Sequence, residues 1–257
     1  MNQLIPWLRG TSFKPSYEGV LPEVVTVDGA LTLALHAPRR RSASLQLALG
    51  ARRHSRAVTH SSESPLSPPG AFRQALLAVP PLERDAWLSR LFGLEQIPDD
   101  GTLPRGCVPY LPAPVDSVVR AVDELGITTG DVVVDVGSGV GRAAALFQLL
   151  SEAEVICLEL QPQLVQASRE LFSRLGTQRV SFVLGDAVEQ LPALERGSVF
   201  FLYCPFSGER LERFLAGLRP LAEKRELRLA CVDLPLPELP WLEELPGAGS
   251  LQLYRSR

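Results

Sequence analysis

A glycine-rich segment in the second half of the chain has residue types suited to binding a small ligand. Residues 132–142 read Val-Val-Val-Asp-Val-Gly-Ser-Gly-Val-Gly-Arg. The valines predict a buried strand that ends near Asp135, and the glycines predict a loop followed at once by a helix. Gly137, Gly139 and Gly141 are expected because the backbone must turn sharply and let a ligand approach without a Cβ in the way. A glycine loop at the carboxyl end of the first strand marks a ligand-binding crevice.

The spacing of these glycines distinguishes between two classes of ligand. Dinucleotide-binding folds use G-x-G-x-x-G, and the helix that follows holds a pyrophosphate at its N-terminus. Here the spacing is G-x-G-x-G, and Asp135 precedes it. A carboxylate beside the loop would repel a pyrophosphate but can attract the amino group of a methionine moiety. The segment therefore favours S-adenosylmethionine over a dinucleotide.

Two further acidic residues stand at the ends of the next two predicted strands. Glu159 ends the strand predicted for 154–159, where a carboxylate can accept both hydrogen bonds from a ribose diol. The alternative is that Glu159 only precedes a helix that begins at Pro162. Asp186 follows the third strand, and its side chain can accept a hydrogen bond from the exocyclic amine of adenine. Three acids at three consecutive strand tips predict a nucleoside site, although each alone is ordinary helix-start chemistry.

The elements that would position these residues alternate along the chain. Apolar strand-like runs separated by helical stretches are typical of a parallel sheet covered on both faces. The predicted strands are 131–135, 154–159, 180–184, 198–203 and 226–233, and the helices begin near Val115, Val140, Pro162, Ala187 and Ser207. After Asp233 comes a proline-rich stretch, and then a run at 250–255 that we interpret as an antiparallel edge strand. The predicted fold is α/β, Rossmann-like and doubly wound, with a mostly parallel sheet.

The first part of the chain has a different pattern. Valines and leucines at 25–35 alternate around Asp28-Gly29, which predicts a β-hairpin, and 45–49 predicts a third strand. Arginines at 39–41, 52, 53 and 56 are interpreted as a solvated edge or, alternatively, as a patch for an acidic substrate or phosphate. We therefore predict four segments: a β-hairpin-rich region at 1–60, a linker at 61–70, a helical lead-in of two short helices broken at Pro80-Pro81 within 71–104, and the main domain at 105–257.

Composition limits the classes of protein. The chain has 257 residues, 46% of them hydrophobic, with no run long enough for a membrane span and no signal-peptide pattern, so we expect a cytoplasmic protein that does not act at a membrane. A formal net charge of −3 gives no broad attraction to nucleic acid. The four cysteines are widely spaced, which predicts free thiols and no metal site. The oligomeric state stays open.

From about residue 105 to 257 the sequence resembles the class I, seven-stranded, S-adenosylmethionine-dependent methyltransferases, most specifically in the loop at 135–142. The resemblance implies the following cofactor contacts: Gly137, Gly139 and Gly141 on the methionine portion with Ser138 among them, Asp135 under the methionine amine, Glu159 on the ribose hydroxyls with Leu160 beside it, and Asp186 with Ala187 on adenine. The segments 108–112 and 158–160 are similar to those of non-SET protein-lysine methyltransferases. In that group the first of these segments packs over the cofactor, which makes Tyr110 a further candidate contact.

The fourth strand ends in Tyr203-Cys204-Pro205-Phe206. Amine-directed methyltransferases often have Asn or Asp, two prolines and an aromatic residue here. This chain keeps a proline and the aromatic residue but lacks the amide or acid, which argues against adenine-N6 or glutamine-amide methylation. We expect Tyr203 to orient the acceptor through its hydroxyl and Phe206 to pack on it; the alternative is that both are core residues at a strand end.

Methyl transfer from a sulfonium requires mainly alignment of nucleophile, methyl carbon and sulfur, with water excluded. The three histidines all precede residue 61, which argues against a histidine base unless the N-terminal region covers the crevice. The main hypothesis is therefore a methyltransferase that acts on a protein side chain, lysine being one candidate, or on a small metabolite. The alternative is an inactive cofactor-binding sensor or scaffold.

Overall fold

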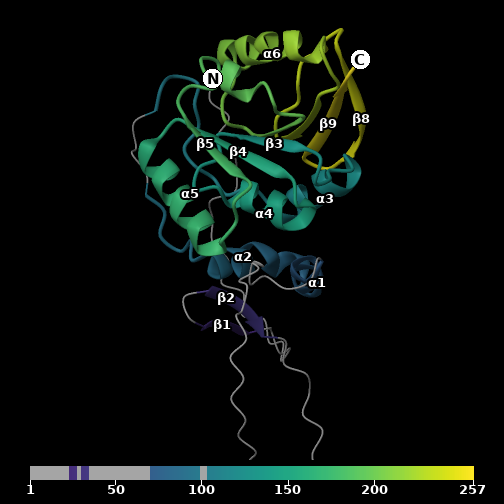
Figure 1. Ribbon diagram of the computed structural model, residues 1–257. Coiled ribbons are helices and arrows are strands. Elements are labelled where there is room, and N and C mark those ends of the chain that lie inside the picture. Colours follow the sequence, from purple (N-terminus) through teal and green to yellow (C-terminus); the bar gives the residue numbers. More distant parts are fainter. Residues whose placement is uncertain (1–22, 28–29, 35–69, 99–102) are drawn as a thin grey trace, which may run out of the picture.

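The computed structural model describes residues 23–27, 30–34, 70–98 and 103–257. Within them, seven strands form one sheet in the order β5-β4-β3-β6-β7-β9-β8 (Figure 1). The strands are β3 (Val132–Val136), β4 (Glu154–Glu159), β5 (Val180–Leu184), β6 (Val199–Tyr203), β7 (Arg228–Val232), β8 (Leu242–Ala248) and β9 (Leu251–Ser256). Strands β3 to β7 pair in parallel, and β9 is antiparallel to both of its neighbours. The mostly parallel, Rossmann-like fold expected from the sequence is confirmed.

The C-terminal part of the sheet holds a strand that the sequence did not predict. The antiparallel strand expected at 250–255 is β9, but β8 lies outside it and forms the edge of the sheet. Pro246 and Gly247 interrupt the alternation within β8, and its register against β9 shifts between Leu245 and Ala248. A proline is tolerated at a sheet edge because its missing N–H faces away from the partner strand.

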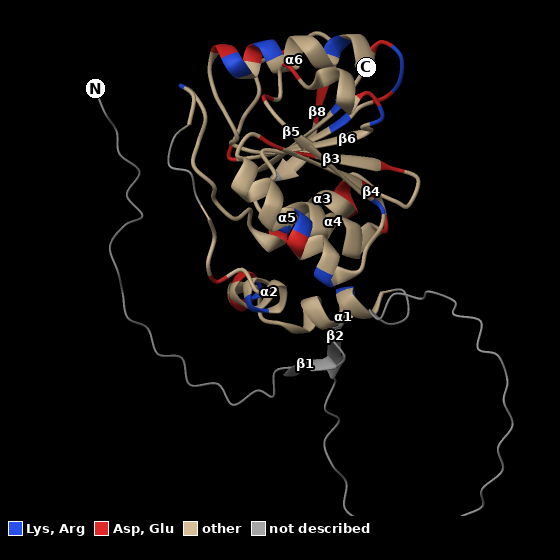
Figure 2. Cartoon of the chain, turned by 60° about the vertical axis from the view of Figure 1, so that its left-hand side comes forward, with Lys and Arg blue, Asp and Glu red and all other residues tan. Residues whose placement is uncertain are grey.

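Helices cover both faces of the sheet: α1 (Ala71–Ala78), α2 (Arg84–Phe92), α3 (Val115–Glu124), α4 (Arg142–Ser151), α5 (Pro162–Leu175) and α6 (Glu209–Ala222). Successive residues of a strand point to opposite faces of the sheet, so they pack in the two different hydrophobic cores. Val133 and Phe201 pack with α1 to α5, whereas Val134 and Phe200 pack with α6. Figure 2 shows charged residues of both signs along α5 and α6. The helix expected near Ala187 is wrong; in its place a turn leads into a short 3-10 helix, Leu191–Leu194.

The two short helices expected in the lead-in are present and belong to the same core. Helix α1 ends at Ala78, a 3-10 turn spans Pro81–Glu83, and α2 follows. Phe72 and Trp87 lie with their ring centroids 6.2 Å apart, and both pack in the cluster that covers one face of the sheet. Figure 1 shows both helices below α4.

The hairpin predicted near the start of the chain is present as two strands, β1 (Glu23–Val27) and β2 (Ala30–Ala34), which pair antiparallel with Val27 opposite Ala30. The third strand at 45–49, the arginine clusters and nearly all of the linker lie outside the described residues. The division into four segments therefore stays a prediction. Among the described residues no helix is long and apolar enough to cross a membrane.

Candidate functional site

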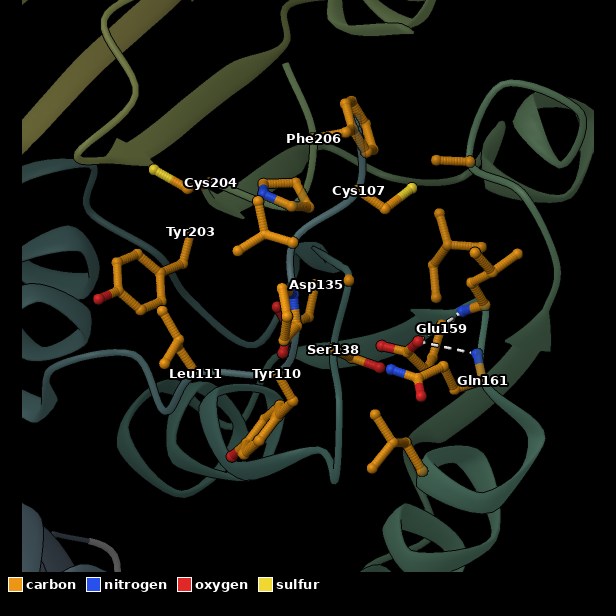
Figure 3. A pocket seen from close by; sticks show the side chains of 18 of the residues that line it. Cys107, Tyr110, Leu111, Asp135, Ser138, Glu159, Gln161, Tyr203, Cys204 and Phe206 are labelled. Atoms are coloured by element: carbon orange, nitrogen blue, oxygen red, sulfur yellow. Dashed lines mark hydrogen bonds between the residues drawn. The ribbon is translucent and has the colours of Figure 1, made fainter. Parts of the chain in front are cut away.

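A pocket of about 810 Å³ opens where the parallel strands β3 to β7 end. Its volume lies within the usual range for small-molecule sites. Predicted site residues that line it are Tyr110, Asp135, Gly137, Ser138, Glu159, Leu160, Asp186, Ala187, Tyr203 and Phe206. In Figure 3, Asp135, Ser138 and Glu159 lie near the middle, and Tyr203 lies to one side. The structure thus brings together side chains that are up to 96 residues apart in sequence, from Tyr110 to Phe206.

The glycine loop has the backbone that its composition predicts. Gly137, Gly139 and Gly141 have φ angles of 75°, 55° and 77°, which residues other than glycine rarely adopt. The N–H groups of Gly137 and Ser138 both donate to the Leu158 carbonyl at 2.9 Å, so the loop is held against the end of β4.

Packing also demands glycine in this loop. A Cβ on Gly137 would lie 2.8 Å from Pro205 Cβ, one on Gly139 would lie 2.0 Å from the Tyr110 ring, and one on Gly141 would lie 2.2 Å from Ser168 Oγ. The sequence analysis assigned the space beside these glycines to a ligand, but at Gly139 the Tyr110 ring occupies it. Gly139 and Gly141 are not among the residues that line the pocket, so their direct contact with a cofactor stays a prediction.

Glu159 is buried, and its carboxylate accepts three backbone hydrogen bonds. Oε2 accepts from Gly139 N at 2.8 Å, while Oε1 accepts from Leu160 N at 2.7 Å and from Gln161 N at 2.9 Å. The side chain therefore joins the glycine loop to the start of α5. A carboxylate has about four acceptor positions, so the oxygens keep about one for a ribose hydroxyl, fewer than the two hydrogen bonds that the sequence predicted. The two roles considered for Glu159, ribose ligand and helix-start residue, are compatible in this geometry.

Asp135 is 3% exposed, and its Oδ2 accepts a hydrogen bond from Ala144 N at 3.1 Å, in the first turn of α4. Burial raises the pKa of Asp135 to about 7, and the charge of Glu159 adds to this, although the bond from Ala144 opposes it. Both protonation states are therefore populated near neutral pH. A cationic ligand above this carboxyl group would favour its ionised form.

Asp186 is held from two sides. Its Oδ1 accepts from Val188 N at 2.9 Å, and its Oδ2 forms an ion pair with Arg210 on α6. The sequence did not identify Arg210, because a single arginine near a helix start belongs to no motif. Arg210 lines the pocket beside Asp186 and Ala187, so the predicted adenine end contains a cation as well as an acid.

The segment before α3 crosses the pocket and lines it with residues 107–111. Its packing over a cofactor stays a prediction. Cys107 forms an antiparallel bridge with Phe206, Val108 N donates to Pro205 O at 3.3 Å, and Ser207 N donates to Gly106 O at 3.1 Å. These bonds tie the segment to the loop after β6. The Tyr110 hydroxyl is buried and has no partner among the described residues. Burial raises the pKa of Tyr110 to about 12, so its phenol stays protonated at neutral pH.

On the side predicted for the acceptor, Tyr203 is partly buried at the end of β6 and lines the pocket. Burial raises its pKa, and the charges of Asp233, Cys204 and Asp85 raise it further. Phe206 also lines the pocket, while its ring packs edge-on against Phe214 with centroids 5.5 Å apart. Phe206 therefore has features of both interpretations given above, and the acceptor roles of both residues stay predictions.

Arg142 is a site residue that sequence reasoning missed. Its guanidinium is buried, donates to Ala113 O at 2.6 Å and pairs with Asp85 at 2.8 Å. Asp85 in turn accepts from Val115 N at 3.2 Å. The last residue of the glycine loop thus connects α4 to α2 and α3. Nothing in the sequence indicates a partner 57 residues away.

The chain is similar to a family of protein O-methyltransferases. The family model for protein-L-isoaspartate(D-aspartate) O-methyltransferase matches residues 73–194, just under half of the chain. A protein-L-isoaspartate O-methyltransferase of Methanococcus maripaludis is 31% identical over 118 residues, which is 45% of this chain and 54% of the relative. One of Methanocella arvoryzae is 35% identical over 95 residues, 36% of this chain and 50% of the relative. The chain thus spans about half the length of these relatives.

Solved structures give a more distant likeness. An RNA methyltransferase from Salinibacter ruber in complex with S-adenosyl-L-homocysteine is 24% identical with a TM-score of 0.46, and covers 57% of this chain and 92% of its own. A putative caffeoyl-CoA O-methyltransferase from Staphylococcus aureus is 11% identical with a TM-score of 0.48, covering 72% and 97%.

These comparisons correct one expectation. The class I methyltransferase fold is confirmed, but the closer likeness to non-SET protein-lysine methyltransferases is not supported, since the relatives above are named for isoaspartate. The physical reason is that the glycine loop and the acids at the strand tips concern the cofactor. Such features do not distinguish one methyl acceptor from another.

Proposed function

We propose that this chain is an S-adenosylmethionine-dependent methyltransferase that esterifies a carboxylate of a protein, with isoaspartyl residues as the first candidate acceptor. The observation that carries the proposal is one pocket that joins the glycine loop to Asp135, Glu159 and Asp186, in a stretch matched by the isoaspartate methyltransferase family model.

The residues of the pocket fit this cofactor. S-adenosylmethionine carries a sulfonium and an ammonium group, and acidic side chains favour such a cationic ligand. Ser138 is buried and lines the pocket, so its hydroxyl can take part in a hydrogen bond to the ligand. Glu159 would hold the ribose, Asp186 and Ala187 would face adenine, and Asp135 would lie under the methionine amine. When bound, the cofactor supplies an electrophilic methyl group.

A carboxylate acceptor also suits the groups on the acceptor side. A lysine must lose a proton before it can attack, whereas a carboxylate is already ionised at neutral pH. The described lining of the pocket contains neither histidine nor lysine. Tyr203, whose pKa is raised, stays protonated and can donate a hydrogen bond to one acceptor oxygen while the other attacks.

The acceptor has to be tested separately from the cofactor. The family match ends at residue 194, before β6 and the loop at 203–207 that borders the proposed acceptor position. A small-metabolite acceptor and an inactive sensor remain the rival hypotheses, and no feature of the pocket favours either. The cytoplasmic location also stays a prediction.

The test combines binding with turnover. Calorimetric titration should give saturable binding of S-adenosylhomocysteine and none of NAD. The full chain should then transfer labelled methyl to a peptide with one isoaspartyl residue, more slowly to the aspartyl form, and not to a peptide whose only nucleophiles are lysines. Methylation of the lysine peptide alone would contradict the carboxylate assignment, and binding of NAD alone would contradict the cofactor assignment.

A further inference from the structure

Two residues at neighbouring strand tips hold a backbone conformation that is unusual for residues with side chains. Cys204 follows β6 with φ of 43°, and Asp233 follows β7 with φ of 51°. Among the described residues the one other such case is Glu152, which caps the end of α4. Backbone strain of this kind is frequent at functional sites, and both Cys204 and Asp233 line the pocket.

The backbone at these two tips is fixed by several contacts. Tyr203 pairs with Val232 at the ends of β6 and β7. The Cys204 thiol donates to Asp233 O at 2.9 Å and to Val232 O at 3.3 Å, and Asp233 N donates to Ser250 O at 2.9 Å. Asp233 is therefore held through its main chain, while its side chain is exposed at the pocket.

The carboxylate of Asp233 is uncommitted, unlike the other acids of the pocket. Asp135 and Glu159 accept backbone hydrogen bonds, and Asp186 pairs with Arg210. Asp233 has no donor to its carboxylate among the described residues. The two arginines of the lining offer none, because Arg142 pairs with Asp85 and Arg210 with Asp186.

The position of Asp233 assigns it to the acceptor half of the pocket. The three acids expected to contact the cofactor lie at or near the ends of β3, β4 and β5, on one side of the sheet order. Asp233 follows β7, two strands from β3 in the opposite direction, beyond Tyr203 of β6. Its charge acts on the Tyr203 phenol, which places the two groups within electrostatic reach.

We propose that Asp233 binds a cationic side chain, lysine or arginine, that lies near the methylated carboxylate in the acceptor protein. This rests on the proposed function. An acceptor carboxylate that enters a pocket lined by acids is repelled by them. A cation beside it would pair with Asp233 and offset that repulsion, so the pair would select acceptors by charge.

The test uses three peptides with the same isoaspartyl acceptor and lysine, norleucine or glutamate at the neighbouring positions. Asp233→Asn is the informative variant, because asparagine tolerates positive φ as aspartate does. The wild-type chain should prefer the lysine peptide. In Asp233→Asn, the ratio of kcat/KM for the lysine peptide to kcat/KM for the norleucine peptide should fall about fivefold, as expected for a partly exposed ion pair. Added salt should reduce the preference of the wild-type chain.

Glu152→Gln serves as the matched control, since it changes a carboxylate on a positive-φ residue that does not line the pocket. Binding of S-adenosylhomocysteine should be unchanged in both variants, which shows that they are folded. An unchanged ratio between lysine and norleucine peptides in Asp233→Asn would overturn this inference and leave the methyltransferase assignment intact. If no peptide receives a methyl ester, the carboxylate assignment fails and the inference fails with it.

Discussion

At the scale of single residues, the acids of the pocket serve the protein as well as the proposed ligand. Glu159 shows this most clearly, because three backbone N–H groups, from the glycine loop and from the residues before α5, donate hydrogen bonds to its carboxylate. Its replacement must therefore alter the glycine loop as well as the ribose site.

For Glu159→Ala we expect binding of S-adenosylhomocysteine to weaken by about 1.5–3 kcal/mol, the range for hydrogen bonds to a charged group. We also expect a lower melting temperature, because buried N–H groups lose their acceptor. Glu159→Gln keeps one acceptor oxygen, so it should lose less stability. Calorimetry and thermal unfolding measure the two effects, with Glu170→Ala on the exposed side of α5 as the control. Normal binding by Glu159→Ala would leave Glu159 a purely structural residue.

Asp135 predicts a specific pH dependence. Its pKa in the folded chain is about 7, compared with an ordinary value of 3.8. Between these values the folded state holds a proton that the unfolded state releases, so the contribution of Asp135 to stability falls as pH rises from about 4 to 7. A pKa that differs by one between the folded and unfolded states changes the free energy of unfolding by about 1.4 kcal/mol. Unfolding free energies measured at pH 4 to 8 should therefore decline less steeply in Asp135→Asn. Equal slopes would show that burial does not raise this pKa.

The sequence identified which acids gather in the pocket but not what holds them. Acids at the tips of successive parallel strands must meet at one edge of the sheet, so Asp135, Glu159 and Asp186 could be grouped from strand spacing alone. The pairing of Asp186 with Arg210 depends on how α6 packs on the sheet, which no local pattern encodes.

At the scale of elements, the segment before α3 and the glycine loop fit each other closely. The Tyr110 ring occupies the position that a side chain on residue 139 would need. Tyr110 was predicted as a cofactor contact from the motif at 108–112, while its packing on Gly139 was not. A motif identifies a segment that lies near a site, but it does not identify the atoms against which that segment packs.

Gly139→Ala should therefore lower both stability and cofactor affinity. Gly126→Ala is the matched control, because Gly126 has a similar φ of 61° but no atom within 4 Å of its added Cβ. The control isolates the cost of the backbone conformation, about 1–2 kcal/mol. Gly139→Ala should cost more, and adding Tyr110→Ala should recover part of the difference, which a double-mutant cycle in melting experiments would measure. An equal loss of stability in Gly139→Ala and Gly126→Ala would mean that Tyr110 moves away from the added Cβ at no cost.

The sequence analysis was wrong about two elements, and each error has a physical reason. β8 contains Pro246 and Gly247, which are rare inside strands, and it exists because β9 offers a partner edge. The stretch after Asp186 has helical periodicity, but Pro192 restricts it to the short 3-10 turn at 191–194. Strand bounds elsewhere agree with the sequence within about two residues, because continuous apolar runs between helices leave few alternatives.

At the scale of the whole molecule, the lead-in helices α1 and α2 pack in the same core as one face of the sheet. Phe72 and Trp87 are in the core that covers one face of the sheet, and Asp85 pairs with the buried Arg142 of the glycine loop. The family match also begins within α1, at residue 73.

Removal of residues 1–69 should therefore preserve folding and binding of S-adenosylhomocysteine, while removal of residues 1–104 should abolish both. If the arginine-containing N-terminal region contributes to acceptor recognition, the shorter truncation should also reduce methylation of protein acceptors. Thermal unfolding, calorimetry and acceptor kinetics on the two truncated chains measure these effects. Full stability after removal of residues 1–104 would contradict the role of α1 and α2 in the core.

The most direct test of the proposed function is the nature of the bond that the transferred methyl group forms. The full chain is incubated with an isoaspartyl peptide and S-adenosylmethionine labelled in its methyl group, and the product is then treated with mild alkali. A methyl ester hydrolyses to labelled methanol, whereas a methylated amine survives. We predict that the label is released as volatile methanol; label that stays on the peptide after alkali would contradict carboxylate methylation.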